Sequence, residues 1–166
     1  YISSRNRQAS NIYFELFPEI RKWQTTVQLQ ADRDGYLKNV FGYIHRFYKI
    51  FDWKKDHGQW VKRPGPDGPK AVAFLPQSNA KGIIAEAMLR LFFNRFAEAG
   101  QYLRLQVHDE LVLSVPEAQT ERVMRVVRAE MEKPIEQLPL PASYRMGPYL
   151  TIGTESKIGE RWGIMS

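Results

Sequence analysis

The first part of the chain carries apolar residues at the spacing of an amphipathic helix. Between about residues 5 and 34 they recur three and four positions apart, which places them on one helical face. They are Ile12, Leu16, Ile20, Trp23 and Val27, with Tyr13 and Phe17 beside them. Pro18 lies inside this pattern and is expected to kink or divide the helix, because proline removes a backbone donor. Gly35 is expected to end it.

Shorter apolar runs further along the chain predict strands. Residues 35–51 are rich in aromatic and β-branched types on both sides of Gly42, which favours a pair of short strands. The runs at 103–107 and 111–115 alternate apolar and polar positions, as half-buried strands do, with Leu105 among the inward-facing residues. Only three residues separate these two runs, so they predict a hairpin. Residues 149–153 can supply one more strand.

Two further helices complete the expected fold. Residues 79–98 carry a helical stripe that Ser78 or Asn79 can cap and Gly100 can end, and a last helix over 118–133 should stop before Pro134. The resulting class is α+β, with one antiparallel sheet covered by helices on one face. That sheet would contain the strands from 36–50, 103–115 and 149–153. The long helix of residues 1–34 would precede a second part, residues 35–166.

Composition favours a polyanionic partner and excludes sites that depend on cysteine. Lys and Arg number 24 against 18 Asp and Glu, which gives a formal charge of +6 and favours nucleic acid or acidic surfaces. The absence of cysteine excludes disulfides and thiolate zinc sites. No run reaches the roughly 18 apolar residues of a membrane span.

Residues 53–70 carry five basic and two acidic side chains together with three prolines, and are expected to form an exposed irregular loop. Trp53 and Trp60 within it could stack on bases. A phosphate-contacting loop and a solvated insertion remain equally open.

The residues between the two apolar strands are ionisable. His108, Asp109 and Glu110 occupy a position where hairpins normally use glycine or asparagine. Carboxylates on such a rigid element suit a metal-dependent enzyme, although the spacing alone favours an ordinary exposed polar turn.

The longer string LRLQVHDELVLSVPE resembles the third polymerase motif of family A (DNA polymerase I type) DNA polymerases. AFLPQSNAKGIIAEAMLRLF is similar to the family's helix along the DNA minor groove. Its tripeptide PQS resembles that of phage-type members. SNIYFELFPEIRKW with DGYLKNVFGYIHRF resembles the helix leaving the fingers and the strand pair after it. YLTIGTESKIGERW resembles the closing strand and tail. The resemblance spans nearly the whole chain, and residues 53–70 are its main departure.

The resemblance implies roles for the three residues of the tip. Asp109 matches the aspartate that ligates the catalytic magnesium ions, and Glu110 the carboxylate that supports this site. His108 matches the residue that approaches the primer-terminal phosphate.

It also implies contacts with DNA from other positions. Gln77 matches the glutamine that bonds base edges in the minor groove, and Arg46 matches more loosely a basic residue after the family's glycine. The family often has an asparagine four positions before the glutamine, and here that position is Ala73. The minor-groove bond of that asparagine is either absent here or supplied by Asn79.

The family's two-magnesium nucleotidyl transfer needs a second bridging carboxylate. The remaining acidic residues are better explained as surface or structural charges, and the family places that aspartate upstream. The resemblance therefore implies a polymerase fragment, inactive alone, from a soluble enzyme of the cytoplasm of a bacterial or phage-infected cell. Its partners would be primer-template DNA, dNTP and the remaining N-terminal part of the polymerase, with no membrane.

Two alternatives stay open on the residues alone. One is a non-catalytic basic nucleic-acid-binding module. The other is a metal-dependent nuclease, which would need further ligands where only His45 and His57 remain as histidines outside the tip.

Overall fold

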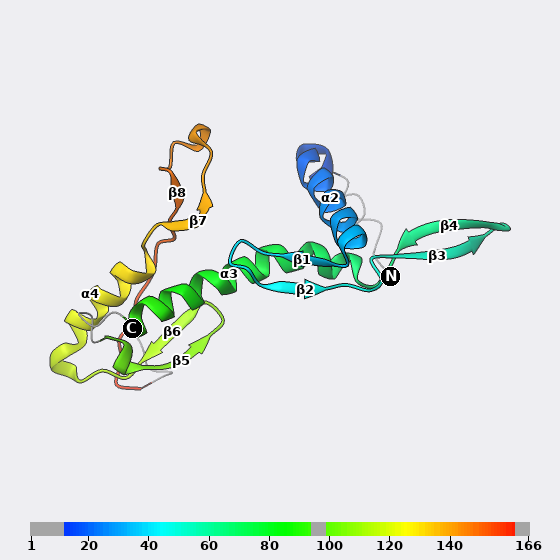
Figure 1. The fold of residues 1–166 in the computed structure, drawn as a ribbon. Helices are drawn as coiled ribbons and strands as arrows, with labels where there is room; N and C mark the ends of the chain where they lie inside the picture. The colour runs from blue at the N-terminus through cyan, green and yellow to red at the C-terminus, as the bar shows by residue number, and fades with distance from the viewer. Residues whose placement is uncertain (1–11, 94–98, 162–166) are drawn as a thin grey trace. The chain divides into compact units, whose positions relative to one another are not determined.

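The computed structural model describes residues 12–93 and 99–161 (Figure 1). Its contacts divide the chain into two units, Tyr1–Ser78 and Asn79–Ser166, and each is described by itself. Both contain α-helices and small antiparallel ladders, so the α+β class is confirmed. The expected division into a long helix over residues 1–34 and a second part over residues 35–166 stays a prediction.

The first helical segment is divided at the proline, as predicted. Residues 12–16 are helical, Phe17 leaves the helical conformation, and α2 (Pro18–Asp34) begins with the proline in its first turn. Proline suits that position because the first amides of a helix have no intrahelical acceptor. Gly35 ends α2 in the left-handed region at φ 74° and donates its N–H to Ala31 O over 3.0 Å. Residues 5–11 of the predicted helix lie outside the described residues.

The predicted strand pair follows directly. β1 (Tyr36–Lys38) and β2 (Ile44–Arg46) are antiparallel. The buried Asn39 organises the connection, because its Oδ1 accepts from the backbone N–H of Phe41 at 3.0 Å and of Tyr43 at 2.8 Å. A side chain that satisfies two loop amides in this way fixes the return of the chain.

A hydrophobic core holds the first unit together. It joins residues from α2, from β1, from the segment after β2 and from the start of α3, which excludes water from one side of each element. The buried members are Val27, Ala31, Leu37, Phe47, Ile50 and Ala71, with Phe51, Phe74 and Leu75 packed against them.

The prediction of an irregular loop at residues 53–70 is wrong. This stretch forms a hairpin of β3 (Phe51–Asp56) and β4 (Gln59–Pro64) and then enters α3, which begins at Gly68. The prolines permit this because Pro64 ends its strand and Pro69 lies in the first turn of the helix. The turn residues His57 and Gly58 have φ of 46° and 86°, the pair of positive values that suits a two-residue hairpin.

The helix predicted to start at Asn79 starts earlier. α3 (Gly68–Phe93) passes through Pro76, so Ser78 and Asn79 lie in its interior and cap nothing. The Ser78 hydroxyl instead donates to Leu75 O, one turn back, at 3.3 Å. The predicted helix end falls at residues 94–98, outside the described residues.

The second unit contains the predicted hairpin and last helix. After η1 (Ala99–Tyr102) come β5 (Leu103–Val107) and β6 (Glu110–Leu113), and then η2 (Glu117–Gln119) leads into α4 (Thr120–Met131). The helix ends before Pro134, as expected. The core of this unit lies between the hairpin, α4 and the end of α3. Its buried members are Leu91, Ala99 and Val123, with Tyr102, Leu111, Leu113, Val115, Val126 and Val127 packed against them.

The expectation of one sheet is wrong for the described residues. They form four separate two-stranded ladders, the last made by β7 (Ile135–Pro139) and β8 (Tyr149–Leu150), with η3 (Ala142–Tyr144) between them. In the β1–β2 and β5–β6 ladders, apolar side chains pack against helices of the same unit, which stabilises these short strands without a neighbouring sheet.

The segment after β8 is held by a carboxylate rather than by strand pairing. Glu132, next to the end of α4, accepts from both the N–H and the hydroxyl of Thr154, each at 2.8 Å. These hydrogen bonds hold the pKa of Glu132 below its ordinary value. The predicted strand over 149–153 is thus confirmed only at its first two residues. Within residues 12–93 and 99–161, no helix has the length and apolar character needed to cross a bilayer.

Candidate active site

The candidate site lies at the turn between β5 and β6. Val107 pairs with Glu110, so the turn itself contains only His108 and Asp109, and Glu110 already belongs to β6. His108 has a positive φ of 52°, a region that glycine favours and that histidine adopts more often than most other residues. The side-chain amide of Gln106 donates to the His108 carbonyl and braces the turn from within the hairpin.

The carboxylates of Asp109, in the turn, and of Glu110, at the start of β6, are open to solvent. His108, Asp109 and Glu110 are all exposed. Asp109 and Glu110 form no hydrogen bond or ion pair with any other described residue. Asp109 is also the single aspartate between residues 79 and 166. An exposed carboxylate that no protein group neutralises is available to a cation or to a charged ligand.

A β-bulge at Arg104 decides which way the hairpin faces. Leu105 pairs with Val112, whereas Leu103 pairs with Leu113. Over this interval β5 therefore contains one more residue than β6, which is Arg104. The guanidinium of Arg104 donates from Nη1 to Gln101 O at 2.7 Å and to Leu103 O at 3.1 Å. These bonds hold the extra residue in place.

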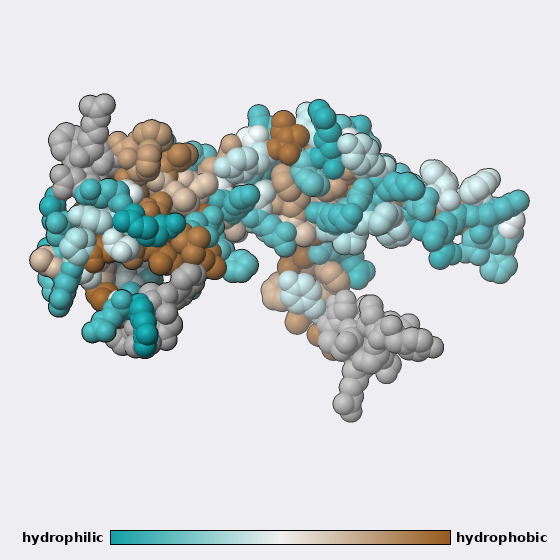
Figure 2. All heavy atoms as spheres, turned by 90° about the horizontal axis from the view of Figure 1, so that it is seen from below, coloured by the Kyte–Doolittle hydropathy of each residue, from teal (hydrophilic) through white to brown (hydrophobic). Residues whose placement is uncertain are grey.

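The bulge turns Leu105 away from the core. Leu111 and Leu113 pack into the core of the second unit, and the ladder therefore places Leu105 and Val112 on the opposite face, together with Glu110. Leu105 is 45% exposed, so its predicted inward orientation is wrong. Figure 2 shows hydrophobic atoms on the surface of the part of this unit that holds β5 and β6.

The base of the hairpin is tied to neighbouring elements. Ser114 N donates to Tyr102 O at 2.9 Å, and the Tyr102 hydroxyl donates to Gln119 Oε1 at 2.6 Å. Arg90 of α3 donates to the carbonyl of Glu130 at the end of α4 over 2.9 Å. A turn supported in this way presents its side chains from a fixed position, which suits a site.

The donor set fits part of a magnesium site. Among the described residues no group of three or more His, Asp or Glu side chains lies close enough to hold a metal ion. Magnesium nevertheless takes one or two protein carboxylates and completes its shell with water and substrate phosphates. Asp109 and Glu110 can supply those carboxylates, and any further protein ligand would come from outside the described residues.

The other predicted contact residues are distributed over both units. Gln77 is exposed on α3 and Arg46 is exposed at the end of β2, and both belong to the first unit. Asn79 is half-buried on α3 in the second unit. His108, Asp109 and Glu110, which are consecutive in the chain, are thus the part of the predicted set that lies together. Reasoning from sequence missed Gln106 and Arg104, whose only signal was a polar position within a strand.

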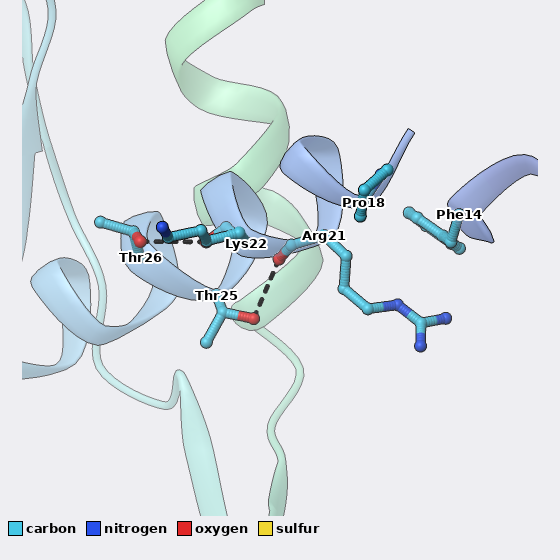
Figure 3. A pocket seen from close by; sticks show the side chains of 6 residues that line it. All are labelled: Phe14, Pro18, Arg21, Lys22, Thr25 and Thr26. Atoms are coloured by element: carbon cyan, nitrogen blue, oxygen red, sulfur yellow. Dashed lines mark hydrogen bonds between the residues drawn. The ribbon is translucent and has the colours of Figure 1, made fainter. Parts of the chain in front are cut away.

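A hollow on the surface of α2 is a poor alternative site. Figure 3 shows its lining side chains, and all come from α2 and the residues just before it: Phe14, Pro18, Arg21, Lys22, Thr25 and Thr26. The hydroxyls of Thr25 and Thr26 donate to carbonyls of their own helix at 3.0 and 2.9 Å. Arg21 lies over the Phe14 ring at 4.5 Å. No set of polar groups converges on this hollow, so it offers little to a ligand.

Comparison with known proteins decides the family. The model of DNA polymerase family A matches residues 3–162. The chain belongs to this family. Family A membership confirms the resemblance read from LRLQVHDELVLSVPE.

Individual family A relatives are bacterial and viral. The thermostable DNA polymerase I of Thermus aquaticus is 32% identical over 151 residues, which is 90% of this chain and 16% of the relative. DNA polymerase I of Geobacillus stearothermophilus is 29% identical over 138 residues, 82% of this chain and 15% of the relative. The DNA polymerase of Mycobacterium phage L5 is 27% identical over 153 residues, 89% and 20% respectively. The chain thus spans about a sixth of the bacterial relatives it matches. No solved structure matches it.

Proposed function

We propose that this chain contributes one part of the active site of a DNA-directed DNA polymerase. The observation that carries the proposal is the family A match over residues 3–162, which includes an exposed, unpaired aspartate at the turn of the β5–β6 hairpin. The relatives named DNA polymerase support the same activity for a longer polypeptide that contains this chain.

Asp109 is the proposed magnesium ligand, and Glu110 supports it from the first position of β6. Two bound magnesium ions would activate the primer 3′-hydroxyl and neutralise the leaving pyrophosphate. Asp109 can offer its carboxylate because no described side chain competes for it. His108, the other residue of the turn, is proposed to contact the primer-terminal phosphate through its exposed ring.

Gln77 and Arg46 are proposed DNA contacts of the first unit. Both side chains are exposed, and Gln77 can donate to the minor-groove acceptors that all base pairs share. Such contacts hold primer-template DNA without reading its sequence. Asn79 is the candidate to supply the minor-groove bond that Ala73, with no polar side chain, cannot make.

The chain is proposed to need a complementary polypeptide. It covers about a sixth of its bacterial relatives, and its described residues hold no cluster of three potential metal ligands. The second bridging carboxylate and most of the dNTP contacts would come from the remaining N-terminal part.

Primer extension tests the proposal. The 166-residue chain is mixed with a primed template, Mg²⁺ and dNTP, alone and together with a polypeptide that supplies the proposed N-terminal part of the polymerase. We expect extension only in the mixture. Asp109→Asn should lower it by on the order of 100-fold or more, because a metal ligand supplies several kcal/mol of transition-state stabilisation. Extension by the chain alone would refute the need for a second polypeptide.

Two further variants distinguish a role in the proposed metal site from the general effect of removing one negative charge. Glu110→Gln should lower extension by about tenfold, as expected for a group that supports a metal ligand. Glu117→Gln removes another exposed carboxylate of the second unit and should leave extension unchanged. Equal activity of Asp109→Asn and Glu117→Gln would exclude Asp109 from the site.

A further inference from the structure

The β3–β4 hairpin carries two exposed tryptophans on one face. Trp53 pairs with Lys62 and Lys55 pairs with Trp60 across the ladder. Side chains of directly opposed residues lie on the same face, and residues two apart on a strand do so as well. Both tryptophans and both lysines therefore share one face, called the Trp face below. Trp53 is 59% exposed and Trp60 is 66% exposed.

Charge is divided unequally between the two faces of this hairpin. The opposite face holds Asp52, Asp56, Lys54 and Arg63, so its formal charges cancel. Arg63 is ion-paired with Asp56 across this opposite face. The Trp face holds two lysines and no acidic residue from either strand.

The two lysines of the Trp face differ in their surroundings. Lys62 is paired with Asp32 of α2 at 3.0 Å and lies 4.1 Å from the centre of the Phe51 ring. Lys55, opposite Trp60, forms no ion pair with any described residue. Lys55 is consequently the cation on this face that is ready to meet a phosphate.

The hairpin is anchored by residues at its base, so the two tryptophans are not needed to hold it in place. Phe51 packs against the core of the first unit at the base of the hairpin, and Gly65 N donates to Ile50 O at 2.8 Å. The outer part of the hairpin extends from the rest of its unit, as Figure 1 shows. A short two-stranded hairpin gains little by exposing two large aromatic rings, so this arrangement indicates a binding surface.

We propose that the Trp face binds single-stranded nucleic acid, with bases stacking on Trp53 and Trp60 and a phosphate meeting Lys55. Stacking on aromatic rings needs an open base face, which a duplex buries within its stack. Two lysines alone neutralise too few phosphates to hold a duplex firmly. The surface belongs to the first unit and its binding requires neither Asp109 nor nucleotide transfer, so it stands apart from the proposed polymerase activity.

Binding of a short fluorescein-labelled oligothymidylate to the 166-residue chain tests this surface. Anisotropy reports affinity, and quenching of tryptophan fluorescence reports stacking. We expect quenching on binding and a preference of about tenfold or more over a blunt duplex of equal length. The slope of log K against log salt should lie between roughly −0.7 and −1.4, as one or two phosphate contacts to a single strand require.

Matched variants locate the contact on one face. Trp53→Ala and Trp60→Ala should each weaken binding by about tenfold, whereas Tyr48→Ala, at an aromatic residue that is 85% exposed but outside the hairpin, should not. Lys55→Gln should weaken binding several-fold, and Lys54→Gln on the opposite face should leave it unchanged. Circular dichroism of each variant checks that the hairpin still folds.

Four results would overturn the proposal. They are absence of oligonucleotide binding, parent-like affinity in both tryptophan variants, equal effects of Lys54→Gln and Lys55→Gln, or a duplex bound as tightly as the single strand. None of these results bears on primer extension, which depends on Asp109.

Discussion

Leu103 lies directly opposite Leu113 in the β5–β6 ladder, although simple alternation along the chain would group Leu103 with Leu105. The bulge at Arg104 breaks the alternation, so that Leu103 shares a face with Leu113 while Leu105 lies on the other. The hairpin thus directs Leu111 and Leu113 into the core and leaves an apolar outer face beside Glu110.

The bulge predicts losses of stability of different size for two aspartate substitutions. Leu113→Asp places a charge against the core of the second unit and should lower the free energy of unfolding by about 3 kcal/mol or more. Leu105→Asp places the charge on a side chain that is already 45% exposed and should cost less than about 1 kcal/mol. Thermal or urea unfolding of both variants measures the difference. Comparable losses would mean that Leu105 also faces the core.

Sequence reasoning identified elements better than it identified faces or ladders. The division of the first helix at Pro18 and the hairpin at residues 103–113 followed from patterns that depend on neighbouring residues alone. The orientation of Leu105 did not, because a bulge adds one residue without any strong local signal. The prolines at 64 and 69 suggested an irregular loop, yet their positions at the end of β4 and in the first turn of α3 make them compatible with both elements.

The residue types of the candidate site could be predicted from the sequence, but the side-chain contacts around them could not. The ionisable turn and its exposure could be expected from polar residues between two apolar strands. The brace from Gln106 and the free carboxylate of Asp109 depend on side-chain positions that spacing does not encode. The same holds for the Trp face, where the register of β3 and β4 separates basic from acidic residues.

The positive φ of His108 predicts a gain in stability on substitution by glycine. His108→Gly removes the steric cost of the left-handed region and should raise the free energy of unfolding by about 0.5 to 1 kcal/mol. His108→Val should lower it by more than about 1 kcal/mol, because a β-branched side chain is poorly accommodated there. Thermal unfolding of the two variants should therefore shift in opposite directions. Shifts of the same sign would exclude backbone strain at this turn.

Asp67 predicts a pH dependence of the first unit. The Lys70 ammonium, followed by the backbone N–H groups of Tyr48 and Lys49, lowers the pKa of Asp67 from 3.8 to about 2. Because the pKa is depressed in the folded state, the stabilisation is complete above the unfolded value and is lost as the pH falls through about 2. Asp67→Asn should therefore flatten the decline of stability between pH 3.8 and about 2.

The contribution of the ion pair to this pH dependence can be separated from that of the backbone bonds. Lys70→Gln removes the largest cause but keeps both N–H donors, which lie 3.1 Å from Asp67 Oδ2. Its pH dependence should lie between those of the parent chain and Asp67→Asn. Urea unfolding followed across this range measures all three chains. A steep decline in Asp67→Asn equal to that of the parent would assign the acid sensitivity to another carboxylate.

Gly100 and Gly153 predict opposite responses to the same substitution. A Cβ added at Gly100 would lie 2.6 Å from Leu91 O and 2.8 Å from Phe92 Cα, and backbone atoms of α3 cannot move aside cheaply. Gly100→Ala should therefore cost about 1 to 3 kcal/mol, as overpacking does. A Cβ at Gly153 meets nothing within 4 Å and its backbone is not in the left-handed region, so Gly153→Ala should be neutral or stabilise by up to about 1 kcal/mol.

Thermal unfolding of the Gly100→Ala and Gly153→Ala chains gives the comparison, since both positions belong to the second unit. A parent-like melting temperature for Gly100→Ala would mean that η1 does not approach the end of α3 as closely as Ala99 and Leu91 indicate. The base of β5 follows directly from η1. A loss of stability in Gly100→Ala accompanied by lower primer extension would therefore show that this close approach also sets the position of the Asp109 turn.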